Sequence, residues 1–279
     1  MAHAIYDHSF LSHEAEDQFN SHLDLMRFCT VDRTLEGTAG MKRLINVYTA
    51  TNGTEKLAQG QGNSKSIEVG HTQREYNIEL AQNRFDWYDE EAMRDPNLVP
   101  VGMEHAGTDM FNTVNGDVFG EFEKASMSVE AATFNFDAFA DAKALLKLPE
   151  NQDVEVFGWV SRKAKAICRK ALKDDLKYIE AFSRTGYIGT VCGINLYDKE
   201  DAKDNEICIG TKAAVTAFVK KGTEVELITK DTRSAEDANV RKNTSFTRKY
   251  YVVALTNETQ AAKIALTNET QAAEIALNA

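Results

Sequence analysis

The sequence predicts a folded protein that combines α-helices and β-strands in a layered structure. Apolar residues recur at spacings of three and four from Asn97 to about Ala125, as they do on one face of a long helix. In the middle of the chain, helical and strand-like segments alternate, which is typical of helices that cover a sheet. Other segments alternate apolar and polar residues with the two-residue period of a half-buried strand.

Composition and charge narrow the class of protein. The chain has 279 residues, of which 43% are hydrophobic and 27% charged, as in an ordered domain. Its N-terminus carries acids and histidines where a signal peptide needs a basic start, and no stretch approaches about 18 consecutive apolar residues. We therefore expect a protein that is made and kept in the cytosol, with no membrane partner. The formal net charge of −11 argues against tight wrapping around nucleic acid.

The N-terminal part predicts an arm followed by a protruding ribbon. Residues 1–42 have weak periodicity, which indicates an arm more than a domain. Two strand-like segments follow, "RLINVYTA" and "EYNIEL", and the polar segment between them is far longer than a hairpin loop of about two to five residues. An isolated ribbon is marginally stable in water, so we expect this one to leave its own subunit and to pack on a neighbour.

The predicted long helix and the acids before it allow more than one interpretation. Gly107, Gly116 and Gly120 each cost about 1 kcal/mol in a helix interior, so we expect close packing against another backbone to compensate. The preceding segment could offer paired carboxylates for glycoside cleavage. An acidic first turn, stabilised by the helix dipole, is the favoured interpretation. The acids concerned are Asp86, Asp89, Glu90 and Glu91.

The remaining elements follow in order. We expect a helix at "NFDAFADAKALLKL", a strand at "DVEVFGWVS" and a basic helix from Arg162 to Lys170, whose cations are better explained by a solvated or subunit-facing surface than by a nucleic-acid site. Strands follow from Glu206 to Lys230 and around "TRKYYVVALT". The C-terminus repeats "ALTNETQAAKI" with one change, and we expect that deletion of residues 267–279 leaves folding intact.

A glycine-rich stretch, "GYIGTVCGINLY", raises the question of a nucleotide site. A phosphate-binding loop needs a Lys-Ser/Thr pair after its last glycine, and a dinucleotide-binding turn needs its glycines in the pattern G-x-G-x-x-G. Gly186, Gly189 and Gly193 have spacings of three and four, and β-branched residues surround them. We therefore expect a strand with tight bends.

No other pattern predicts chemistry. The cysteines Cys29, Cys168, Cys192 and Cys208 are far apart and are expected to be small buried side chains. His3, His8 and His13 rotate by about 140° per step on a helix and so cannot line one face for a metal. We predict no catalytic, cofactor-binding or metal-ligating residues, which is the profile of a self-assembling subunit.

In the order of its segments the chain resembles the major capsid proteins of tailed bacteriophages, with the Hong Kong phage type of shell fold. The segments that carry the resemblance run from Arg43 to Leu266: the extended loop, "QNRFDWYDEEAM" before the long helix, "GYIGTVCGINLYDKED", "IGTKAAVTAFVKK", "TEVELITKDTRSAEDANVRK" and "KYYVVALTNETQAAKIAL".

The resemblance implies an α+β subunit with four parts. These are an N-terminal arm (1–42), an extended β-hairpin loop with its base (43–80), a peripheral domain with a long spine helix (81–135 and 230–279) and a mixed α/β axial domain (136–229). The glycines Gly186, Gly189 and Gly193 become bends of the axial domain. The loop would overlap a neighbouring subunit through Thr54, Lys56, Gln59, Gln61, Lys65 and Arg74.

The resemblance also implies a function and partners. Hexamers and pentamers would close an icosahedral shell around viral double-stranded DNA, in loose contact with it, and the protein would be a virion component assembled in the host cytoplasm. Portal and scaffolding or decoration proteins would be partners. Some family members form a lysine-to-asparagine isopeptide bond; Lys56 and Lys65 lie in the loop, but no matching asparagine or glutamate is assigned. The alternatives are an encapsulin-like compartment, a carbohydrate- or nucleotide-processing enzyme that uses the acids near Asp86, and a monomeric binding module.

Overall fold

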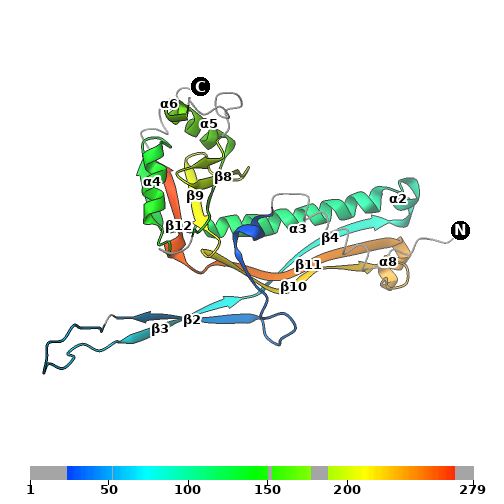
Figure 1. Cartoon of the computed structure of the whole chain (residues 1–279). Helices are drawn as coiled ribbons and strands as arrows, with labels where there is room; N and C mark the ends of the chain where they lie inside the picture. The colour runs from blue at the N-terminus through cyan, green and yellow to red at the C-terminus, as the bar shows by residue number, and fades with distance from the viewer. Residues whose placement is uncertain (1–23, 52, 150–152, 177–187, 268–279) are drawn as a thin grey trace.

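The computed structural model describes residues 24–51, 53–149, 153–176 and 188–267. Within them the chain forms a four-stranded sheet, a six-stranded sheet and a separate two-stranded ribbon (Figure 1). Helices accompany both sheets, so the predicted α+β class is confirmed. No helix in the described ranges has the length and apolar character needed to cross a membrane.

The four-stranded sheet lies along the long helix α3 (Leu98–Phe122) (Figure 1). Its strands, in spatial order, are β1 (Thr30–Asp32), β10 (Val215–Ile228), β11 (Lys242–Leu255) and β4 (Glu79–Tyr88). Two short helices, α2 (Asp89–Arg94) and α8 (Ala235–Val240), lie at its far end. The predicted apolar stripe of α3 is buried, which confirms the long helix: Met103, Met110, Phe111, Val114, Val118 and Phe122.

The six-stranded sheet carries two helices on one face. Its strands, in spatial order, are β5 (Met127–Ala131), β12 (Ala261–Leu266), β9 (Glu206–Thr211), β6 (Val156–Val160), β8 (Ile194–Asp198) and β7 (Thr190–Val191). The two helices are α4 (Phe136–Leu145) and α5 (Arg162–Ala171), and the short α6 (Lys173–Leu176) follows α5. Both α4 and α5 share an apolar cluster with Val156 and Val160 of β6. The alternate residues of that strand, Phe157 and Trp159, belong to the cluster on the other face, as the period of a strand requires.

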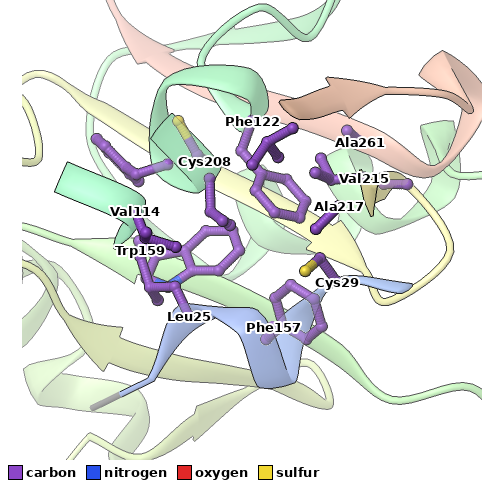
Figure 2. Close-up of a cluster of buried hydrophobic side chains, with 14 of the residues drawn as sticks. Leu25, Cys29, Val114, Phe122, Phe157, Trp159, Cys208, Val215, Ala217 and Ala261 are labelled. Carbon is purple, nitrogen blue, oxygen red and sulfur yellow. The ribbon is translucent and has the colours of Figure 1, made fainter. Parts of the chain in front are cut away.

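A hydrophobic cluster joins the two sheets (Figure 2). Trp159 lies against Phe122 of α3, with ring centroids 4.4 Å apart, and against Phe157 at 5.0 Å. Leu25, from the short 3-10 helix η1 (Leu25–Phe28), covers the same cluster. Burial raises the pKa of Cys29 and of Cys208 to about 12, so these thiols act as small apolar side chains.

The sheets do not follow the predicted domain boundaries. The two strands β5 and β12, expected in the peripheral segments 81–135 and 230–279, lie in the six-stranded sheet. Strand β10, expected in the axial segment 136–229, pairs with β11 in the four-stranded sheet. The reason is that the chain crosses between the two larger sheets three times, through α3 after β4, after β9 and after β11, and no composition change marks the last two crossings.

The structure also tests two local predictions, one for the segment "EYNIEL" and one for the glycine-rich stretch. "EYNIEL" is not a single strand, because β3 (Val69–Asn77) ends and β4 begins on either side of buried Ile78, whose N–H donates to the carbonyl of Met41 at 2.7 Å. The tight bend at Gly193 is confirmed: Cys192 and Gly193 have φ of 52° and 75° and form the two-residue turn between β7 and β8. Gly189, directly before β7, accepts a hydrogen bond from the N–H of Leu196 at 2.8 Å. Gly186 is outside the described residues.

The repeated C-terminal segment lies only in part within the described residues. Its first copy forms the end of β11, the 3-10 helix η2 (Glu258–Gln260) and most of β12, and β12 ends at Leu266. The expectation that residues 267–279 can be deleted stays a prediction.

Candidate assembly surfaces

The two-stranded ribbon projects from the rest of the molecule (Figure 1). It consists of β2 (Lys42–Ala50) paired antiparallel with β3 (Val69–Asn77), in a register that runs from Lys42 opposite Asn77 to Ala50 opposite Val69. Nine residues per strand give a length of roughly 30 Å. The loop from Thr51 to Glu68 extends it further.

One face of the ribbon is fixed to its own subunit at the base. The ring of Tyr76 stacks on Phe218 of β10, with centroids 5.1 Å apart. On the same face, Arg43 Nε lies 3.2 Å from Asp32 Oδ2. Arg74 pairs with Glu258 of its own chain at 3.6 Å, and its predicted contact with a neighbour stays a prediction. These contacts set the direction in which the ribbon leaves the molecule.

The outer face of the ribbon carries uncovered apolar side chains among polar ones. Residues opposite one another in an antiparallel pair point to the same face, so Leu44, Tyr48 and Val69 share the face that points away from the contacts at the base. Their exposed fractions are 51%, 66% and 64%. The loop adds Leu57 and Ile67, exposed by 47% and 62%. Exposed apolar side chains gathered toward the end of a projecting ribbon are typical of a protein–protein contact.

The loop at the end of the ribbon has internal order. Glu55 accepts hydrogen bonds from the N–H and the hydroxyl of Ser64, both at 2.9 Å, and the backbone bond is the main cause of the lowered pKa of Glu55. Asn63 donates to the carbonyl of Gly53 at 3.1 Å. Five of the predicted contact residues are exposed on this loop: Thr54, Lys56, Gln59, Gln61 and Lys65.

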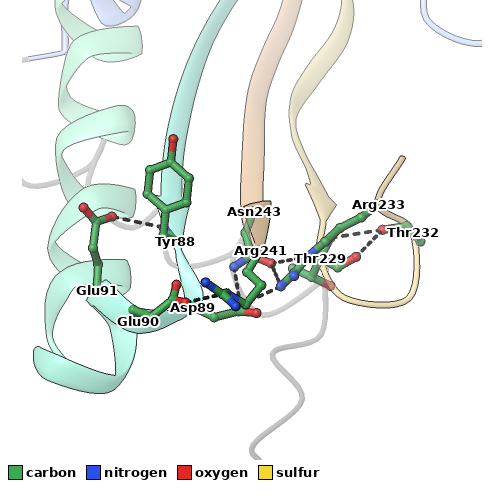
Figure 3. A network of polar contacts seen from close by, with 9 residues as sticks. All are labelled: Tyr88, Asp89, Glu90, Glu91, Thr229, Thr232, Arg233, Arg241 and Asn243. Atoms are coloured by element: carbon green, nitrogen blue, oxygen red, sulfur yellow. Dashed lines mark hydrogen bonds and ion pairs between the residues drawn. The ribbon is translucent and has the colours of Figure 1, made fainter. Parts of the chain in front are cut away.

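The acids near Asp86 form structural ion pairs (Figure 3). Asp89 Oδ1 accepts a hydrogen bond from Arg233 Nη2 at 2.6 Å and from Asn243 Nδ2 at 2.8 Å. The Arg233 side chain is 6% exposed, and its hydrogen bond is the main cause of the lowered pKa of Asp89. Asp89, Glu90 and Glu91 form the acidic first turn of α2, which confirms the helix-start interpretation for these three acids. The interpretation is wrong for Asp86, which lies on β4.

Asp86 is held in a similar way. It lies on β4 and accepts hydrogen bonds from Arg84 at 2.8 Å and from Thr244 at 2.7 Å. Partial burial acts to raise its pKa, but the bonds from Arg84, Thr244 and Lys242 outweigh burial and lower the pKa to about 2. A carboxylate held ionised in this way is not suited to act as a general acid near neutral pH.

A groove with a volume of about 540 Å³ separates α3 from β4 and β11, and Gly116 and Gly120 line it. A Cβ added at either glycine would meet nothing within 4 Å, so the expectation that backbone packing compensates for them is wrong within this subunit. The close approach occurs at Gly102, where an added Cβ would overlap the ring of Phe85. Sequence reasoning missed Gly102 because Phe85 lies on a different element.

Within the described ranges, no group of three histidine, cysteine or acidic residues is placed to hold a metal ion.

Comparisons with known proteins identify the fold. No family model and no curated protein matches the sequence. Among solved structures, the capsid of the cyanophage P-SCSP1u matches with a TM-score of 0.65 and 13% identity, over 86% of this chain and 87% of that one. The mature capsid of bacteriophage PhiM1 matches with a TM-score of 0.66 and 10% identity, over 88% of each chain.

A third structure bears on the alternative of a non-viral compartment. A virus-like particle from Pyrococcus furiosus matches with a TM-score of 0.58 and 12% identity, over 92% of this chain and 98% of that one. The chain therefore has the fold of phage capsid and virus-like particle subunits. The resemblance stated from the sequence is confirmed at the level of the fold.

Proposed function

We propose that this protein is the major capsid protein of a tailed bacteriophage, the subunit that builds the shell of the virion. The observation that carries the proposal is the group of uncovered apolar side chains on the ribbon and its loop, in a chain with the capsid fold. Contact with a neighbouring copy would remove Tyr48, Val69 and Ile67 from water, at roughly 25 cal/mol per Å² of apolar area. A ribbon fixed at its base and uncovered toward its end is built for contact with another subunit.

Assembly explains why a marginal ribbon is retained. Each copy would give its ribbon to one neighbour and receive one from another, so that weak contacts add up in a closed shell. Hexamers and pentamers of this subunit would form an icosahedral head around double-stranded DNA. A net charge of −11 fits a loose contact with the packaged DNA. The protein would act in the virion after assembly in the host cytoplasm, with portal and scaffolding or decoration proteins as partners.

Substitutions on the outer face of the ribbon test this proposal. Tyr48→Asp combined with Val69→Asp should leave the fold of the subunit unchanged, because both side chains are exposed in it, and should abolish particle formation. Met93→Asp on α2 is the matched control, since Met93 is 81% exposed and lies outside the ribbon. Circular dichroism reports folding and negative-stain images report particles. Normal particles from the doubly substituted chain would contradict the proposal.

An encapsulin-like compartment is the second candidate, and the match to the Pyrococcus furiosus particle favours it. The two functions differ in what the particle encloses. Particles of a phage capsid would hold nuclease-protected double-stranded DNA, whereas a compartment would hold a defined protein and no genome. Extraction of particles purified from their native source, followed by nucleic-acid and protein analysis, distinguishes them.

The proposal includes no enzymatic activity. An enzyme that used the acids near Asp86 would lose turnover on Asp86→Asn or Asp89→Asn. The ion pairs of both residues instead predict a loss of stability, with no dependence of any reaction on them.

A further inference from the structure

Helix α5 exposes a row of positive charges. It buries Ala164 and Cys168 against the six-stranded sheet. The basic stripe on its opposite face consists of the exposed residues Arg162, Arg169, Lys170 and, at the start of α6, Lys173. Helical geometry places Arg162 and Arg169 within about 20° of each other around the axis of α5, and Lys173 follows on α6. The sequence from Arg162 to Lys173 contains no acidic residue, although the whole chain carries a net charge of −11.

The stripe does not serve the stability of its own subunit. The other two cations of the helix form ion pairs: Lys163 with Asp204 at 3.0 Å and Lys165 with Asp198 at 2.8 Å. In the part of the chain that the structure describes, the four stripe residues form no ion pair. A cation in the first turn, such as Arg162, opposes the helix dipole, and Arg169 and Lys173 repel each other at a spacing of four. An external anionic surface would relieve both effects.

Helix α4 presents a surface of opposite character. It packs on β5 and β12 at one edge of the same sheet, whereas α5 packs on β6 further along (Figure 1). The acidic–apolar face of α4 consists of Asp137, Asp141 and Leu145, which lie within about 80° of one another around the axis. Leu145 is exposed by 39%. Of the nearby cations, Lys143 donates to the carbonyl of Cys192 at 3.0 Å and Lys147 lies beyond the end of the helix.

We propose that the basic stripe of one copy binds the acidic–apolar face of α4 on the next copy. The inference rests on the proposed self-assembly and names the surfaces that join neighbours within a ring. Asp137 and Asp141 are four residues apart and span roughly 6 Å along α4, so both can face the cations at the end of α5 and the start of α6. The two surfaces are different parts of one subunit, so the contact repeats head to tail around a closed ring.

The features of α4 favour a second copy of this chain, rather than nucleic acid, as the partner of the basic stripe. Phosphates would satisfy the cations of the stripe but would leave Leu145 exposed. The α4 surface offers the stripe charge complementarity, and the charged pairs would set the register of the contact. The acidity of the whole chain also disfavours a polyanion.

A charge swap in the full-length protein tests the pairing. Arg162→Glu with Arg169→Glu, and separately Asp137→Lys with Asp141→Lys, should each lower the yield of particles by roughly tenfold or more, because like charges then face each other. The chain with all four substitutions should recover at least half of the original yield. The control is Lys163→Glu with Lys165→Glu, which the α4 substitutions should not rescue because those lysines pair within their own subunit.

Cross-linking gives a second measurement that avoids charge reversal. A chain with both Arg169→Cys and Asp141→Cys, oxidised with oxidised glutathione, should form disulfide-linked ladders of several subunits in particles. The unsubstituted chain, which retains partly exposed Cys192, gives the background.

The outcomes are distinguishable. Failure of the swap to restore particles, or only background cross-linking, overturns the inference. The inference is also overturned if the variant with Arg162→Glu and Arg169→Glu forms normal particles that lack DNA. The stripe would then be a phosphate-binding surface. Absence of particles from the unsubstituted chain would instead count against the proposed function.

Discussion

A buried arginine fixes the acidic end of the four-stranded sheet. Arg233 brings Asp89, the first residue of α2, together with Asn243 of β11, and Asn243 itself donates to Asp89 (Figure 3). The acidic first turn of α2 is predictable from the sequence because the dipole effect is local. Its partners are not, since they lie 144 and 154 residues further along the chain.

Substitution of Asp89 measures the contribution of this pair. Asp89→Ala should lower the free energy of unfolding by about 3 kcal/mol, because it leaves the guanidinium of Arg233 buried without a counterion. Glu90→Ala, which removes the exposed pair with Arg241, should cost less than about 1 kcal/mol. Urea denaturation of both variants provides the values. Equal effects would show that burial of Arg233 is not the cause.

The lowered pKa of Asp86 predicts how its contribution depends on pH. Its pKa falls from 3.8 to about 2 in the folded chain, so its stabilisation is complete above the higher value and is lost as the pH falls through the lower one. The difference in melting temperature between the unsubstituted chain and Asp86→Asn should therefore be constant near neutral pH and should shrink between about pH 4 and pH 2. A difference that does not change over this range would contradict the assigned ion pairs.

At the scale of elements, the sequence predicted the features that depend only on residues close together in the chain. The apolar stripe of α3, the helix before Pro149 and the turn at Gly193 all depend on nearby residues. The division at Ile78 was not predictable, because it depends on where the ribbon meets the rest of the chain. The order of strands within each sheet was not predictable either, since β12 inserts between β5 and β9 from far along the chain.

The glycines of α3 give an element-scale prediction. Gly116→Ala and Gly120→Ala should each raise the free energy of unfolding of the subunit by about 1 kcal/mol, because alanine favours the helix and meets no neighbour. Gly102→Ala should lower it, because the added methyl group overlaps the ring of Phe85. Thermal unfolding of the dissociated subunit checks both. Destabilisation at Gly116 and Gly120 would mean that the groove is filled within the subunit.

The whole molecule combines a body that has its own hydrophobic core with a ribbon that has none. The two sheets share one hydrophobic cluster around Trp159, so the body has a continuous core. The ribbon has such contacts only at its base, and its outer face is uncovered. The length and polarity of the loop predicted a protruding ribbon from sequence. The identity of the uncovered residues required the register of β2 and β3, which sequence does not provide.

Determination of the mass and shape of the purified full-length protein tests the central claim most directly. We expect closed shells of many copies in electron micrographs, in which the ribbon of each subunit lies on a neighbour. A single species of 31.1 kDa at every protein concentration, with Tyr48 and Val69 protected from solvent by their own chain, would contradict it.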